Sequence, residues 1–257
     1  MRRRTRRLLL GAGAVPVAFA ALLGVEVQMA RSGPDLEDST PLAHDGRIGG
    51  DGAALRMVWL GDSTAAGQGA SSADTALPRR VARALGRPVD LTVRAISGDR
   101  IDDVVDHQVD GLAELHPDVV LVSIGANDVV HLTTHDAFRD GYRRLVDLVP
   151  DGALLVLLGV PDMGAPPRLA QPLRAIAGWR GRALDDVTRA IARDSGSAYV
   201  DIAGETGPTM RAHAGQDFAA DRYHPSDDGY ALWAAAVLEV LVPRLAAPPE
   251  GGAGVDR

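Results

Sequence analysis

The chain has 257 residues, of which 46% are hydrophobic, and this suits one α/β domain with additional segments. It contains no cysteine, which excludes disulfides, thiolate catalysis and cysteine-ligated zinc. The net charge is −7, and because residues 1–30 carry five arginines and a single acid, the remainder is more acidic than the whole. Such a surface repels nucleic acid, so we expect no nucleic-acid partner.

Residues 1–30 have the layout of an export signal peptide or an N-terminal membrane anchor. The five arginines come first, and an apolar run from Leu8 to Val25 follows, interrupted only by glycine and proline. Thr5 to Leu10 resembles a twin-arginine export signal. The arginines argue against a buried core helix. We expect the rest of the chain to lie outside the cytoplasm, either secreted or anchored, with membrane contact through residues 8–30.

The sequence leaves open whether this segment is cleaved. Ala18-Phe19-Ala20 is a small-x-small site that lies inside the apolar run, and Gln28-Met29-Ala30 is a weak match. The run is close to the ~18 residues that a helix needs to span a bilayer, so an uncleaved anchor is an equal alternative.

Composition divides the remaining chain into three parts. Residues 31–53 are rich in Gly, Pro, Asp and Ser and are predicted to be a flexible linker that holds the domain off the membrane. Residues 247–257 are predicted to be a disordered tail. The folded domain is therefore expected at residues 54–246.

Short apolar segments alternate with helical patterns along this domain. The expected strands are Leu55–Leu60, Val89–Ile96, Asp118–Ile124, Ala153–Val160 and Ala198–Ile202. The expected helices are 74–86, 101–115, 136–149, 170–195 and 226–246. The strand segments are nearly continuous in Val, Leu and Ile, which is typical of strands buried on both faces. The alternation predicts a flavodoxin-like, doubly wound, five-stranded parallel sheet in three α/β/α layers, with strand order 2-1-3-4-5.

Residues that can take part in catalysis or ligand binding follow several of these strands. In a doubly wound sheet, ligands bind beyond the carboxyl ends of the strands. Ser63, Gly98 and Asn127 follow the first three strands, and Asp221 and His224 lie between the fifth strand and the last helix. Each of these short motifs could by itself be a turn or a helix cap. Their shared position at one sheet edge favours a functional site instead.

The combination resembles the SGNH hydrolases, also called GDSL-type esterases and lipases, over residues 55–246. The matching blocks are Gly61-Asp62-Ser63, Ile96-Ser97-Gly98, Gly125-Ala126-Asn127-Asp128 and Asp221-Arg222-Tyr223-His224-Pro225. The resemblance implies that Ser63 is the nucleophile, that His224 is the base and that Asp221 is the acid that orients it. It also implies an oxyanion hole made by the backbone N–H groups of Ser63 and Gly98 and the Asn127 side-chain amide. Arg222 stands where many members have glycine.

The chemistry of these residue types is consistent with that role. A serine hydroxyl needs a neighbouring base to become a nucleophile, and a carboxylate holds the base and stabilises its charged form. The sequence therefore predicts a serine hydrolase that cleaves esters through an acyl-serine intermediate, without a cofactor or a metal. His131 and His135 have a spacing that suits a metal, but no third ligand is evident, so no metal site is expected.

Other functions use the same residues or the same fold. An O-acyltransferase or a carbohydrate deacetylase would need the same triad, and a non-catalytic surface binding module would need only the fold. A dinucleotide-binding site is disfavoured, because Gly61 to Gly69 lacks the Gly-x-Gly-x-x-Gly pattern. Residues 161–172 and 203–220 are expected to border the pocket and set its specificity. The substrate is expected to be a small-molecule, lipid or sugar ester, and the acyl group and the oligomeric state stay open.

Overall fold

The computed structural model describes residues 20–32 and 44–246. Residues 1–19, 33–43 and 247–257 lie outside the described residues. Most of the predicted export segment, part of the predicted linker and the whole predicted tail therefore lie outside them too.

The centre of the fold is a six-stranded sheet in the order β1-β3-β2-β4-β5-β6. Its strands are β1 (Gly46–Ile48), β2 (Leu55–Gly61), β3 (Val89–Val93), β4 (Val119–Ser123), β5 (Leu154–Leu158) and β6 (Ala198–Val200). Strands β2 to β6 are parallel, and counted by themselves they follow the order 2-1-3-4-5. The predicted α/β fold with a doubly wound sheet is confirmed.

One strand was not expected. Strand β1 pairs antiparallel with β3, from Gly46 opposite Leu91 to Ile48 opposite Val89. The prediction of a purely parallel, five-stranded sheet is therefore wrong at this edge, and so is the prediction that the linker extends to residue 53. A three-residue strand with one buried apolar side chain, Ile48, is too short to give a sequence pattern.

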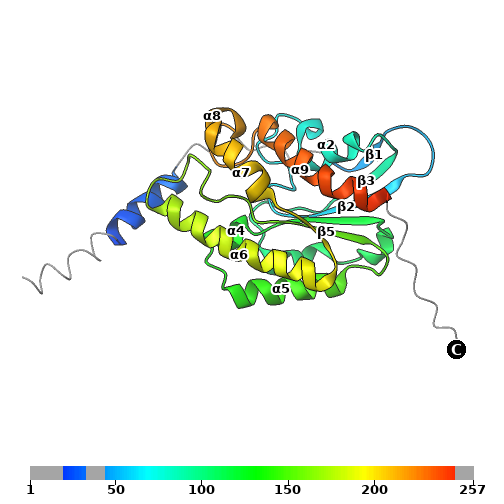
Figure 1. Cartoon of the computed structure of the whole chain (residues 1–257), viewed down its shortest axis with the longest axis horizontal. Helices are drawn as coiled ribbons and strands as arrows, with labels where there is room; N and C mark the ends of the chain where they lie inside the picture. Colours follow the sequence, from blue (N-terminus) through cyan, green and yellow to red (C-terminus); the bar gives the residue numbers. More distant parts are fainter. Residues whose placement is uncertain (1–19, 33–43, 247–257) are drawn as a thin grey trace, which may run out of the picture.

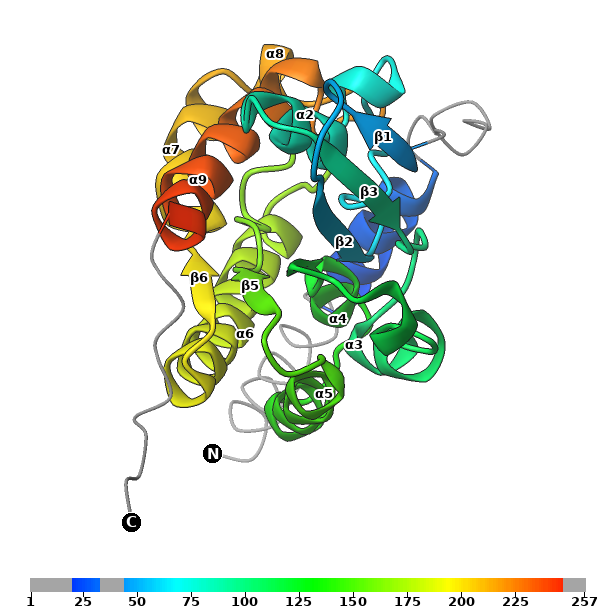
Figure 2. The same cartoon turned by 90° about the vertical axis from the view of Figure 1, so that its right-hand side faces the viewer.

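Helices cover both faces of the sheet. The helices are α2 (Leu77–Ala84), α3 (Ile101–Asp103), α4 (Ala126–Val130), α5 (His135–Leu148), α6 (Leu173–Ser195), α7 (Ile202–Ala212), α8 (Ala214–Asp217) and α9 (Asp227–Ala246). Short 3-10 segments lie at Ala73–Thr75 and Ala113–Leu115, and a π-helical segment lies at Val104–Gln108. Helices α2, α7 and α9 pack on one face and α3, α5 and α6 on the other, which gives the three layers seen in Figure 2.

Strand β2 shows why the sequence pattern was continuous rather than alternating. Met57 and Trp59 belong to the apolar core on the α2/α9 face, whereas Val58 and Leu60 belong to the core on the α5/α6 face. All four side chains are buried, so both faces of the strand select apolar residues. Strand β2 therefore lies inside the sheet and is packed on both faces, and the residues that follow it start from this fixed position.

Residues 203–220 carried no helical pattern in the sequence, yet they form most of α7 and all of α8. Their glycines and Pro208 obscured the pattern. The start of α7 is fixed by Asp201, whose Oδ1 accepts a hydrogen bond of 2.7 Å from the Gly204 N–H.

Among the described residues, α9 is the helix that is long and apolar enough to cross a membrane. Its apolar side chains pack on the sheet, including Tyr230, Trp233, Val237 and Leu241. We therefore interpret α9 as a core helix. The membrane contact expected through residues 8–30 falls largely outside the described residues and stays a prediction.

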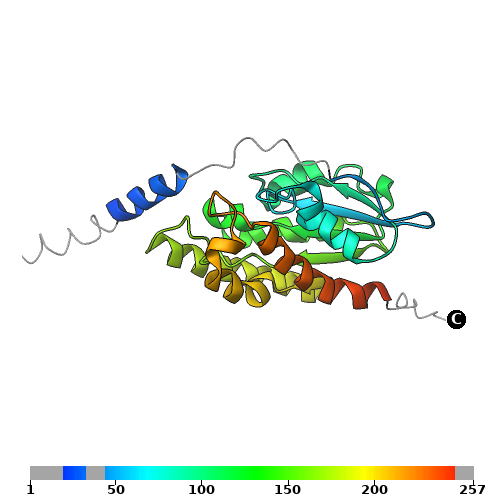
Figure 3. The same ribbon diagram turned by 90° about the horizontal axis from the view of Figure 1, so that it is seen from above.

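The last part of that segment, residues 20–31, forms a helix that we call helix 20–31. Figure 1 shows it in blue beside the beginning of α6. In Figure 3 it lies at the opposite end of the molecule from the C-terminal end of α9.

Candidate active site

The turn after β2 presents Ser63 at the carboxyl edge of the sheet. Gly61, in the last position of β2, has φ 146°, and a Cβ there would lie 2.0 Å from the Ser123 carbonyl oxygen of β4. Only glycine fits at this crossing. The next residue, Asp62, braces the turn, because its Oδ1 accepts hydrogen bonds from the Thr64 N–H (2.9 Å) and the Thr64 hydroxyl (2.7 Å). Asp62 therefore supports the turn that carries Ser63.

Ser63, His224 and Asp221 form one hydrogen-bonded chain. The distance from Ser63 Oγ to His224 Nε2 is 2.9 Å, and the distance from His224 Nδ1 to Asp221 Oδ2 is 2.5 Å. The second Asp221 oxygen accepts hydrogen bonds from the backbone N–H groups of Tyr223 (3.0 Å) and His224 (3.1 Å). The structure thus brings together three predicted residues from opposite ends of the domain, in the geometry that activates a serine.

The charge state of Asp221 suits an orienting role. Burial raises the pKa of this carboxyl, but the hydrogen bonds from the His224 side chain and the Tyr223 backbone outweigh that effect, so its pKa lies below its ordinary value. Asp221 is therefore ionised at neutral pH. An ionised carboxylate accepts a hydrogen bond from the His224 Nδ1–H and leaves Nε2 to face Ser63.

Asn127 and Gly98 lie on the two neighbouring connections. Asn127 is in the first turn of α4, after β4, and its Nδ2 donates a 3.0 Å hydrogen bond to the Asp99 carbonyl oxygen. Gly98 has φ 95°, in the left-handed region that favours glycine. The bond to Asp99 ties the Asn127 amide to the loop that carries Gly98. Among the described residues, Gly98 makes no hydrogen bond to Ser63, His224 or Asp221.

Gln108 joins the loop that carries Gly98 and Asp99 to Gly61 at the end of β2, and the sequence did not predict this role. Its Oε1 accepts from the Gly61 N–H at 2.8 Å, and its Nε2 donates to the Gly61 carbonyl and to Asp99 Oδ2, both at 2.8 Å. The side chain is buried. Its helical spacing from Val104 could have marked it as an inward-facing polar residue, but nothing local reveals partners that are 47 and 9 positions away.

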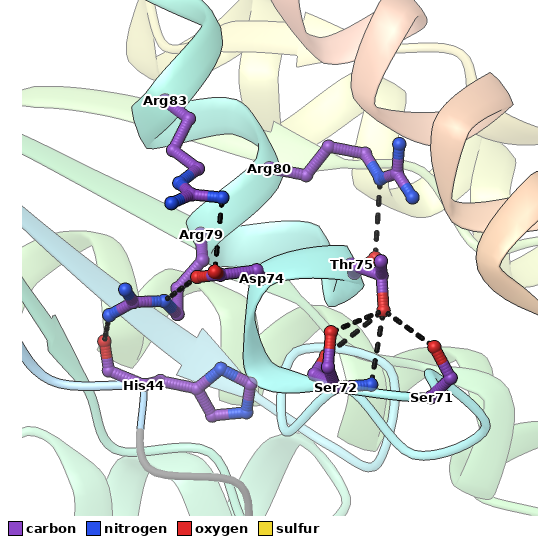
Figure 4. Close-up of polar contacts among 8 residues, drawn as sticks. All are labelled: His44, Ser71, Ser72, Asp74, Thr75, Arg79, Arg80 and Arg83. Atoms are coloured by element: carbon purple, nitrogen blue, oxygen red, sulfur yellow. Dashed lines mark hydrogen bonds and ion pairs between the residues drawn. The ribbon is translucent and has the colours of Figure 1, made fainter.

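His44 supports the turn that carries Ser63, from the segment before β1. The His44 side chain is buried, and its Nε2 donates a 2.7 Å hydrogen bond to the Ala66 carbonyl oxygen. Burial lowers the pKa of this imidazole, which keeps it neutral. Figure 4 shows Arg79 donating to the His44 carbonyl oxygen, with Asp74 between Arg79 and Arg83. Because His44 lies in the predicted linker, no sequence pattern indicated its position beside this turn.

Two further carboxyls, those of Asp62 and Asp128, are buried in this part of the fold. Burial raises the pKa of Asp62 to about 6 and that of Asp128 to about 6. Asp128 follows Asn127 in α4, and its Oδ2 accepts a 3.2 Å hydrogen bond from the Ile101 N–H. This bond attaches α4 to α3, at the end of the loop that contains Gly98.

A cavity of about 40 Å³ opens beside Ser63. Residues from 161–172 and 203–220 contribute to its walls, as expected, among them Met163, Met210 and Phe218. Within residues 20–32 and 44–246, no group of three or more His, Asp or Glu side chains is placed to hold a metal ion.

Comparisons with known proteins place the chain in a family. A model of the GDSL-like lipase/acylhydrolase family matches residues 59–232. The GDSL-like esterase Rv1075c of Mycobacterium tuberculosis is 34% identical over 188 residues, which are 69% of this chain and 59% of that protein. The chain therefore spans less than two thirds of the length of this curated relative.

Solved structures agree on the fold. The lipase/acylhydrolase from Enterococcus faecalis superposes with a TM-score of 0.58 at 22% identity, covering 77% of this chain and 99% of that chain. Axe2, an acetylxylan esterase from Geobacillus stearothermophilus, gives a TM-score of 0.55 at 22% identity, covering 73% and 94%. With its motifs, its fold and these matches, the chain belongs to the GDSL-like lipase/acylhydrolase family of ester-hydrolysing enzymes.

Proposed function

We propose that this chain is an extracytoplasmic serine carboxylic-ester hydrolase that works through an acyl-serine intermediate. The observation that carries the proposal is the hydrogen-bonded chain from Ser63 through His224 to Asp221, with distances of 2.9 and 2.5 Å. The extracytoplasmic location is supported by the arginine-rich start of the chain and the apolar run from Leu8 to Val25.

The reaction proceeds in two halves. His224 Nε2 takes the proton of the Ser63 hydroxyl while Ser63 Oγ attacks the ester carbonyl carbon. Asp221 stabilises the imidazolium that forms. His224 then gives the proton to the alcohol oxygen as the C–O bond breaks, which leaves the acyl group on Ser63. In the second half, His224 activates a water molecule, and the carboxylic acid and free Ser63 are released.

Free donors near the nucleophile support the oxyanion hole. Within the described part of the chain, the backbone N–H groups of Ser63 and Gly98 have no hydrogen-bond acceptor. Asn127 uses one Nδ2 hydrogen for Asp99 and keeps the other. We assign these three donors to the oxyanion hole, where they would donate hydrogen bonds to the negatively charged oxygen of the tetrahedral intermediate. Each such hydrogen bond contributes strongly to the rate.

A covalent probe and two substitutions test the proposal. A fluorophosphonate should label Ser63, and the protein should hydrolyse p-nitrophenyl acetate. Ser63→Ala and His224→Ala should each lower kcat/KM by at least ~10³-fold. Ser195→Ala and His107→Ala change exposed residues of the same types and serve as controls. Folded protein without labelling, or normal turnover in either active-site variant, would refute the assignment.

A further inference from the structure

A larger hollow adjoins the cavity beside Ser63. It is an open groove of about 530 Å³, and Asn127, Tyr223 and His224 line both the groove and the cavity. The groove therefore directly reaches the proposed catalytic base, His224, and one proposed oxyanion donor, the Asn127 amide. Its volume is within the ~300–1,000 Å³ that is usual for pockets that bind small molecules.

Helix 20–31 supplies part of the wall of this groove. Leu23, Val27 and Ala30 line it, and their spacing of four and three residues places them on one face of the helix. The helix lies outside the family's matched region, which begins at residue 59.

Specific contacts hold helix 20–31 in this position. Glu26 is buried, and its Oε2 accepts a 2.9 Å hydrogen bond from the Leu173 N–H in the first turn of α6. The N-cap residue of α6, Pro172, provides no side-chain cap, so Glu26 supplies the carboxylate that this helix start favours. At the other end, Arg168 Nε donates to the Ala30 carbonyl oxygen at 2.5 Å. The helix is thus seated by polar contacts as well as by apolar packing.

The lining of the groove is mostly hydrocarbon. Val130 and Leu132, which follow Asn127, are 54% and 66% exposed although they are large and apolar. Ile176 and Ala177 of α6 continue the same surface. Contiguous exposed apolar surface of this kind marks a binding site for an apolar group. Besides the three residues shared with the cavity, the polar side chains among the described residues that line the groove are those of Arg31 and Arg168. The rest of the lining offers sugar hydroxyls no side-chain hydrogen-bonding partner, whereas an alkyl chain there would lose its contact with water.

We propose that the groove holds the aliphatic chain of the ester substrate and that helix 20–31 is part of the substrate-binding site. This inference rests on the proposed function, because it places the reacting ester beside His224 with its chain in the groove. The chain would belong either to the acyl group or to the alcohol, and two substrate series separate these cases.

The test uses the full-length protein, purified in one detergent, and compares kcat/KM for long and short esters. p-Nitrophenyl decanoate and acetate vary the acyl side, and decyl acetate and ethyl acetate vary the alcohol side. Each methylene that becomes buried should raise kcat/KM by up to ~4-fold. We therefore expect the wild-type protein to prefer the long ester in at least one series.

A matched pair of substitutions on helix 20–31 separates the groove from general effects. Val27→Arg places a charge in the groove and should lower the long-to-short ratio of kcat/KM at least ~10-fold. Val25→Arg changes the same residue type on the same helix at a site that is 56% exposed and does not line the groove, and should leave the ratio unchanged. Leu132→Asn tests another part of the wall. Asparagine tolerates the φ of 60° at this position, so the backbone should keep its conformation, and this ratio should also fall.

The outcomes distinguish this inference from the proposed function. If the wild-type protein hydrolyses the short esters but shows no preference for a long chain in either series, the inference is overturned and the proposed function stands. The same holds if Val27→Arg and Val25→Arg give equal ratios. If the folded protein cleaves none of the four esters, both are overturned. A preference that Val27→Arg removes supports the inference and shows which side of the ester occupies the groove.

Discussion

Replacing Asp62 with asparagine should stabilise the protein at neutral pH while leaving its stability near pH 4 almost unchanged. Asp62 is 1% exposed, and burial raises its pKa from 3.8 to about 6. Asparagine keeps the oxygen that accepts hydrogen bonds from the N–H and hydroxyl of Thr64. The substitution therefore removes the buried charge and keeps the turn.

The size and sign of the effect follow from the pKa. Well below pH 3.8 the carboxyl is protonated in both the folded and the unfolded protein, so it contributes no charge penalty. Between pH 4 and pH 6 the unfolded chain loses this proton while the folded protein keeps it, so stability falls as the pH rises. Above the folded-state pKa of about 6 the penalty is complete, at about 3 kcal/mol for a pKa rise from 3.8.

Denaturant unfolding of wild type and Asp62→Asn at several pH values measures this difference. We expect the variant to gain about 3 kcal/mol relative to wild type between pH 4 and pH 7, or a rise in Tm of about 6–12 °C at the higher pH. Asp151→Asn, an exposed turn residue, is the control and should give a flat difference. The reasoning is refuted if the difference in unfolding free energy between Asp62→Asn and wild type varies by less than about 0.5 kcal/mol over this range. Asp62 would then not be a desolvated carboxyl in the folded protein.

Two further predictions concern the loop that carries Gly98. Asn127→Ala should lower kcat for p-nitrophenyl acetate by ~10²–10³-fold, because it removes one oxyanion donor and the bond to Asp99; a decrease of less than ~3-fold would contradict this role. Gln108→Leu should lower the free energy of unfolding by about 1–3 kcal/mol, because it leaves the N–H of Gly61 unpaired in the core, whereas the Gly61 carbonyl keeps its hydrogen bond from the Ile96 N–H. Chemical denaturation measures this loss, and an unchanged midpoint would show that the Gly61 N–H finds another partner.

The sequence predicted the parts of the fold that repeat a pattern. Strands such as Leu55–Gly61 are apolar on both faces, and this marks them individually as central strands of a parallel sheet. Ser63, Asn127 and His224 could be placed at one edge because the carboxyl ends of parallel strands meet there. The hydrogen bonds between Ser63, His224 and Asp221 agree with that placement.

The sequence did not predict the residues that act through distant partners. Gln108 bonds to Gly61 and Asp99, and His44 bonds to Ala66, 22 positions away. A polar residue inside an apolar pattern indicates burial, but its partner depends on how the chain is folded in three dimensions. Strand β1 was not predicted for a different reason. An edge strand of three residues gains most of its stability from pairing with its neighbour rather than from a buried face.

Helix 20–31 belongs to the predicted export segment and also lines the groove, so cleavage of the N-terminus would change the proposed substrate-binding site. In the sequence, Glu26 is only the single acid of an export-like segment, and in the fold it caps α6 from a buried position. Cleavage after Ala30 would remove Leu23 and Val27 and leave the groove open on that side. An uncleaved anchor, the other predicted outcome, would keep these residues in place. If the chain is exported as we propose, the N-terminal residue of the mature protein decides which form of the proposed substrate-binding site is present.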